Sequence, residues 1–105
     1  MNIQIICDGF ELTPSIKALV QQKVDIRLEK LMTKFAPEMK SALIRIKKDK
    51  FGEYKVNFDM NLPGKENVYA QASHKILESA VIDLSQEAER QIKKYKASLA
   101  NYSLG

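Results

Sequence analysis

Two segments in the middle of the chain alternate between apolar and polar residues. From Tyr54 to Leu62 every second residue is apolar, and the residues between them are polar or charged. Successive side chains of a strand point to opposite faces, so this pattern predicts a half-buried strand. Residues 41–48 show the same alternation, with apolar residues at 42, 44 and 46. The isoleucine-rich residues 2–7 and the alternating residues 68–73 complete the expected strands.

Two longer segments have the period of a helix. Thr13 and Pro14 form a typical helix start, a capping hydroxyl followed by the residue best tolerated at the first helical position. We expect this helix to continue to about Phe35, before Pro37, and we expect Ser73 to cap the second helix. At about 100° per residue, the apolar residues of each helix fall within an arc of roughly 120°, as a core-facing stripe does. These stripes are Ile16, Val20, Val24, Leu28, Leu31 and Phe35, and then Leu77, Ala80, Val81, Leu84, Ala88, Ile92, Tyr95 and Leu99.

The expected order of elements is β-α-β-β-β-α. The first connection contains a helix, so the first two strands should run parallel with a right-handed crossover, while the last three form an antiparallel meander. Both helices need cover, and one apolar face of a four-stranded mixed sheet supplies it. We therefore predict a two-layer α+β sandwich with both helices on one face. Residues 1–105 should form a single domain, with about 97–105 as a short C-terminal tail.

Composition excludes several classes of protein. With 105 residues, one His and one Cys, the chain offers neither an internal disulfide nor a His/Cys metal cluster. No apolar run reaches the roughly 18–20 residues of a membrane helix, and the start lacks the features of a secretory signal, so we expect a cytoplasmic protein. His74 is interpreted as a capping or exposed residue and Cys7 as a small core residue. We therefore predict no enzyme activity, no cofactor, no metal and no small-molecule substrate.

The positive charge is unevenly distributed. The formal net charge is +4, but residues 17–50 carry a net +6. On the first helix, Lys23, Arg27, Lys30 and Lys34 fall along one edge of the apolar stripe, and Arg90, Lys93, Lys94 and Lys96 lie near the end of the second. Clustered basic residues favour phosphate backbones through counterion release. Taken alone, however, such charges are equally well explained by solubility or by the helix dipole, and Glu89 and Lys93 have the spacing of an ordinary surface pair.

The chain resembles one family along nearly its whole length, to about Lys96. The motifs are Asn2-Ile3-Gln4-Ile5, Leu12-Thr13-Pro14-Ser15-Ile16, Leu28-Glu29-Lys30-Leu31, Ala70-Gln71-Ala72 and Glu89-Arg90-Gln91-Ile92. Their order and spacing resemble the bacterial ribosome hibernation promoting factors, which include the ribosome-associated inhibitor A proteins and were formerly described as sigma factor modulation proteins. The resemblance implies a fold similar to a double-stranded RNA binding domain. It also implies a non-enzymatic inhibitor of translation in stress or stationary phase, which binds the small ribosomal subunit where mRNA and tRNA would lie.

The resemblance also implies which residues contact rRNA. One row would be Lys23, Arg27, Lys30 and Lys34, and a second row would be Arg90, Lys93 and Lys94. Arg45 and Lys47 are less secure candidates, because we expect them on the sheet face away from the helices. We expect neither a second domain nor an acidic tail, as in the short members of the family. Those members act beside a separate ribosome modulation factor, which would be a second partner.

Some residues depart from the family pattern and leave an alternative open. Glu87 stands where relatives commonly have a basic residue, and together with Glu78 and Asp83 it places negative charge along the second helix. These acids favour a non-ribosomal, protein-binding regulator of the same fold. The first helix is also one residue longer before Leu28, which predicts that its basic residues are rotated relative to those of the relatives.

Overall fold

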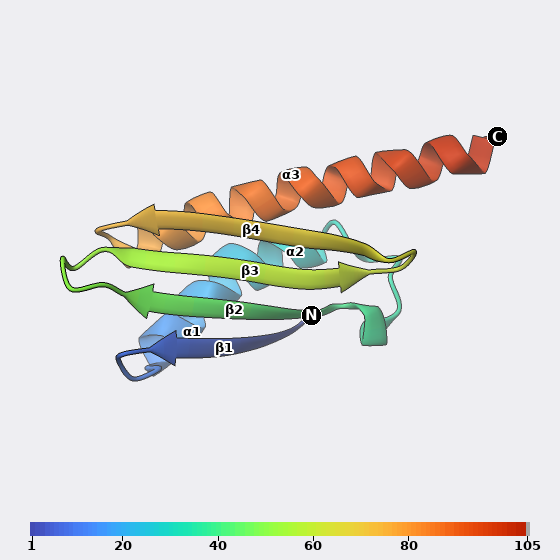
Figure 1. Cartoon of the computed structure of the whole chain (residues 1–105). Helices are drawn as coiled ribbons and strands as arrows, with labels where there is room; N and C mark the ends of the chain where they lie inside the picture. Colours follow the sequence, from blue (N-terminus) through green and yellow to red (C-terminus); the bar gives the residue numbers. More distant parts are fainter. Residues whose placement is uncertain (105) are drawn as a thin grey trace.

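The computed structural model describes the backbone of residues 1–104 and the side chains of residues 1–99. Four strands form one mixed sheet in the order β1 (Asn2–Asp8), β2 (Ser41–Lys48), β3 (Tyr54–Leu62) and β4 (Glu66–His74). β1 runs parallel to β2, and the other neighbours are antiparallel. The helices all lie on one face of the sheet (Figure 1). The predicted α+β architecture is therefore confirmed.

The first helical region starts as predicted but ends earlier. It consists of α1 (Pro14–Val20), a π-helical turn η1 (Gln21–Asp25) and α2 (Ile26–Glu29). The backbone N–H of Ile16 donates to Thr13 Oγ1 at 3.2 Å, which is the expected cap. The predicted end near Phe35 is wrong, because short-range hydrogen bonds from the N–H of Leu31 and of Met32 to the third residue before each tighten the chain after Glu29. Pro37 begins a separate 3-10 turn, η2 (Pro37–Met39).

The π-helical turn sets which residues face the sheet. Val20, Val24, Leu28 and Met32 are each at most 2% exposed, although they follow one another at steps of four residues. In a regular α-helix such residues would drift around the axis by about 40° per step. A π turn takes up more residues than an α turn, so it keeps the steps from Val20 to Val24 and Leu28 aligned. Met32, which lies outside the predicted stripe, is also buried, in the tightened segment that follows α2.

The last helix, α3 (Leu77–Leu104), has 28 residues and projects past the end of the sheet (Figure 1). The molecule is accordingly elongated, measuring 51 Å along its longest axis and 22 and 20 Å along the two other axes. The prediction that Ser73 caps this helix is wrong, since Ser73 pairs with Lys55 inside the sheet. The segment expected as a tail continues the helix to Leu104, and residue 105 lies outside the described residues.

The core lies between the sheet and the helices. Phe58 is its largest fully buried side chain, and Tyr95 and Cys7 pack against its margin as predicted. Within the described residues, no helix has the length and apolar character needed to cross a membrane. The buried hydrophobic residues are Val20, Val24, Leu28, Met32, Ala42, Ile44, Ile46, Val56, Phe58, Met60, Leu62, Val68, Ala70, Ala80, Val81, Leu84, Ala88 and Ile92.

Candidate nucleic-acid interface

One carboxylate joins the two rows of basic residues on the helix side of the molecule. Glu89 on α3 forms ion pairs with Arg27 on α2 and, at 2.9 Å, with Lys93 one turn further along α3. The Lys93 ammonium, followed by the Arg27 guanidinium, lowers the pKa of Glu89. The surface pair Glu89–Lys93 expected from the spacing is therefore confirmed. Two of the candidate cations thus share one negative charge, and this three-residue cluster keeps a net charge of about +1 at neutral pH.

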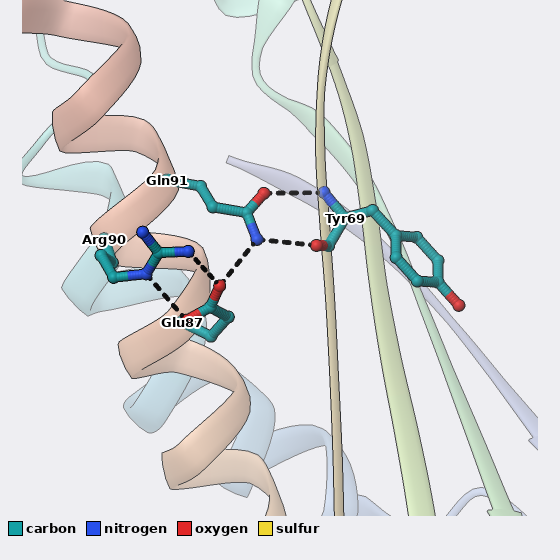
Figure 2. Close-up of polar contacts among 4 residues, drawn as sticks. All are labelled: Tyr69, Glu87, Arg90 and Gln91. Carbon is teal, nitrogen blue, oxygen red and sulfur yellow. Dashed lines mark hydrogen bonds and ion pairs between the residues drawn. The ribbon is translucent and has the colours of Figure 1, made fainter.

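Arg90 is held by a carboxylate on its own helix. Its Nε and Nη2 atoms donate to the two oxygens of Glu87 at 3.0 and 2.7 Å (Figure 2). The Arg90 guanidinium, together with the amide of Gln91, lowers the pKa of Glu87 to about 2. Glu87 therefore does not present an isolated negative charge to a partner. It does, however, neutralise one of the candidate rRNA contacts.

The same cluster fixes α3 to the edge of the sheet. Gln91 accepts a hydrogen bond from the backbone N–H of Tyr69 at 3.1 Å, and its Nε2 donates to the Tyr69 carbonyl at 2.7 Å and to Glu87 at 3.0 Å. Figure 2 shows Gln91 reaching from the helix to β4, with the Tyr69 ring pointing away from α3. β4 is an edge strand, whose outward N–H and C=O groups would otherwise be open to pairing with another strand. Gln91 thus closes the edge at Tyr69.

Four of the candidate cations on the helix side keep their charge free. Lys23, Lys30, Lys34 and Lys94 make no ion pair within the part of the chain that the structure describes. Lys30, Lys34 and Lys94 are exposed, and Lys23 is half-buried. The predicted single ridge is interrupted, because Lys30 is the C-cap of α2 and Lys34 lies in the turn beyond it.

The basic residues of α3 lie on two sides of that helix. Lys93 and Lys96 lie toward α2, where Lys96 Nζ donates to the carbonyl of Leu31 at 2.7 Å. Lys94 instead lines a groove of about 600 Å³ between α3 and the β3–β4 turn, where the Tyr95 hydroxyl donates to the Pro63 carbonyl at 3.0 Å. The second row is therefore divided, and only its α2-facing part adjoins the basic residues of the first helix.

Arg45 and Lys47 lie on the sheet face away from the helices, as expected. Both residues are exposed, and Arg45 Nε is 3.8 Å from Asp8 Oδ2 on the neighbouring strand. Lys55, which the sequence reasoning did not single out, pairs directly with Lys47 across β2 and β3. The strand register that brings these lysines together could not be read from a single segment.

The acids that favoured a protein-binding role are mostly engaged within the molecule. Asp83 lies 3.1 Å from Nε2 of His74, and Glu87 is held by Arg90. Of the three, only Glu78 makes no ion pair among the described residues. His74 is half-exposed, in keeping with the expected surface role. Among the residues described, no group of three or more His, Cys, Asp or Glu side chains is placed to hold a metal ion.

Comparisons with known proteins agree with this architecture. The structure is similar to that of a ribosomal subunit interface protein from Coxiella burnetii, with a TM-score of 0.69 and 26% identity over 92% of this chain and 99% of that one. It also shares its fold with the N-terminal domain of Protein Y from Thermus thermophilus, with a TM-score of 0.71 and 20% identity over 90% of this chain and 99% of that one. No curated protein sequence matches the chain. The model of the family described as "Sigma 54 modulation protein / S30EA ribosomal protein" matches residues 3–100, and the chain belongs to that family.

Proposed function

We propose that this protein is a ribosome-associated factor that binds rRNA of the small subunit and silences idle ribosomes. The observation that carries the proposal is the family match over residues 3–100, whose description names a ribosomal protein. The similar Coxiella burnetii protein is likewise named for a ribosomal subunit interface. The free lysines on the helix side supply a physical means of binding.

The proposed binding uses shape and charge. Folded rRNA presents phosphates at fixed spacings, and a rigid domain with cations on adjacent helices bridges them without reading bases. Lys23, Lys30 and Lys34 offer free charges, and Arg27 and Lys93 lie beside them. Since exposed ion pairs contribute at most about 1 kcal/mol, rRNA phosphates can compete with Glu89 for these two residues. We place Arg90 and Lys94 at the margin of this surface.

Inhibition would follow from occupancy. A domain 51 Å long and about 20 Å wide, lodged in the decoding cleft, would exclude mRNA and tRNA without any chemical step. We propose that this happens in the bacterial cytoplasm during stress or stationary phase, beside a separate ribosome modulation factor. Steric exclusion needs neither a cofactor nor a nucleophile.

Co-sedimentation with purified small subunits at 50 and 200 mM salt tests the proposal. We expect binding at low salt and clear weakening at high salt, because phosphate contacts release counterions. Charge reversal of Lys23, Arg27, Lys30 and Lys34 to Glu should abolish the binding. The absence of binding at low salt, or binding that is indifferent to salt, would contradict the proposal. If the charge-reversed variant still bound a protein partner and neither protein bound ribosomes, the protein-binding alternative would stand.

A further inference from the structure

A second basic surface lies on the opposite side of the molecule from the helices. The open face of the sheet is turned toward the viewer in Figure 1. Side chains of this face enclose a hollow near the end where β2 turns into β3. The hollow has a volume of about 440 Å³. Three basic side chains border it, and its floor supplies amide and hydroxyl groups. The lining residues are Asp8, Arg45, Lys47, Lys55, Asn57, Gln71, Ala72 and Ser73.

The charges in this hollow are only partly balanced internally. Lys47 and Lys55 stand directly opposite each other on β2 and β3, and neither makes an ion pair within the described part of the chain. In the strand register Lys47 lies between Lys55 on β3 and Asp8 on β1, so an opposite charge on one side offsets the like charge on the other. Asp8 is the one acid in the lining and lies 3.8 Å from Arg45. The hollow therefore holds a net charge of about +2 at neutral pH.

An exposed aromatic ring lies in the turn next to this hollow. Phe51 is 78% exposed, and Lys50 Nζ lies 5.3 Å from the centre of its ring. The turn is held by Asp49, whose Oδ1 accepts from the N–H of Phe51 at 2.9 Å and of Glu53 at 3.0 Å. The ring is thus presented on an ordered turn rather than folded onto the sheet. Exposed aromatic rings flanked by cations are typical stacking platforms for unpaired bases.

We propose that this hollow is a second RNA-binding site, which takes backbone phosphates between Lys47, Lys55 and Arg45 while an unpaired base stacks on Phe51. Asn57, Gln71 and Ser73 add neutral groups that hydrogen-bond phosphate or ribose oxygens. RNA is favoured over an acidic peptide because amide side chains and an exposed aromatic ring lie beside the cations, and these groups bind ribose and bases as well as phosphate. The proposal rests on the proposed ribosomal function and deepens it: the domain is held by RNA on two opposite faces.

The test uses the double variant Lys47→Gln, Lys55→Gln in the full chain. Glutamine removes each charge but keeps a long polar side chain, and urea unfolding of the variant shows whether lost binding reflects a loss of stability. In co-sedimentation with small subunits, we expect the slope of log affinity against log salt to fall by about two, one for each lost phosphate contact. The control Lys17→Gln, Lys65→Gln removes the same charge outside the hollow and should change the slope by less than one. Equal slopes for the two double variants would overturn the proposal.

A second measurement separates this inference from the proposed function. If the unmodified protein did not bind small subunits, the proposed function would fail. The hollow would then be judged by NMR titration with a short oligouridylate. We expect amide shifts at Arg45, Lys47, Lys55 and Phe51. Shifts confined to the helix side, or equal shifts with a polyglutamate peptide, would overturn the second site.

Discussion

Replacing Glu87 with glutamine should weaken the fold in a pH-dependent way. The carboxylate accepts two hydrogen bonds from Arg90 and one from Gln91, which itself holds the backbone of Tyr69. Glutamine keeps the size of the side chain but removes its charge and one acceptor oxygen. The variant therefore tests whether the charge of Glu87 stabilises the attachment of α3 to the sheet.

The magnitude follows from the exposure of the carboxylate. The pKa of Glu87 is lowered from 4.5 to about 2, so its stabilising effect is present above pH 4.5 and is lost as pH falls toward 2. Since 38% of the side chain is exposed, solvent screening limits the effect to about 0.5–1 kcal/mol. We expect the free energy of unfolding at pH 7 to fall by that amount, which corresponds to a melting temperature lower by roughly 2–5 °C.

Urea unfolding followed by circular dichroism at pH 7, 4.5 and 2.5 measures this effect. The difference between the unmodified protein and Glu87→Gln should be largest at pH 7 and should nearly vanish at pH 2.5. Glu11→Gln is the matched control, because Glu11 is exposed and makes no ion pair within the described residues. Arg90→Gln combined with Glu87→Gln should be no less stable than Glu87→Gln alone. A difference that is independent of pH, or equal to that of the control, would refute the reasoning.

Three further predictions concern other contacts. Gln91→Ala should lower the free energy of unfolding by about 1–2 kcal/mol and speed hydrogen exchange at the Tyr69 amide, and unchanged exchange would show that the edge is closed by other groups. Met32→Ala should cost about 2–4 kcal/mol in urea unfolding, more than Phe35→Ala, because Met32 is fully buried and Phe35 only partly; the reverse order would show that Phe35 contributes more to the core than its burial indicates. Burial raises the pKa of the Cys7 thiol, so its reaction with a disulfide reagent at pH 8 should be slow in the folded protein and fast in urea, and equal rates would count against a packed thiol.

The strands were predictable because their signal is local. β2 and β3 have the predicted bounds, because the alternation of apolar and polar residues within each segment is enough to identify a half-buried strand. The errors lie where tertiary contacts override the local signal. Ser73 has the character of a helix cap, yet pairing with Lys55 keeps it in the sheet. Phe35 has the spacing of the helical stripe, yet the chain must turn back after Glu29 to reach β2.

The sequence predicts only in part which charged side chains remain unpaired, because some ion pairs form between residues that are far apart in the sequence. Glu89 and Lys93 are four residues apart, so their pairing follows from helical spacing. Arg27 is 62 residues from Glu89, and only the packing of α2 on α3 brings them together. The net charge of a helix therefore overstates what it offers a partner. By the same reasoning, the register decides the charge of the open sheet face: it places Lys47 between Lys55 on β3 and Asp8 on β1, so the three cations of the hollow share one acid. The net positive charge that remains is what an anionic partner would meet, so the sheet face merits the same test as the helices.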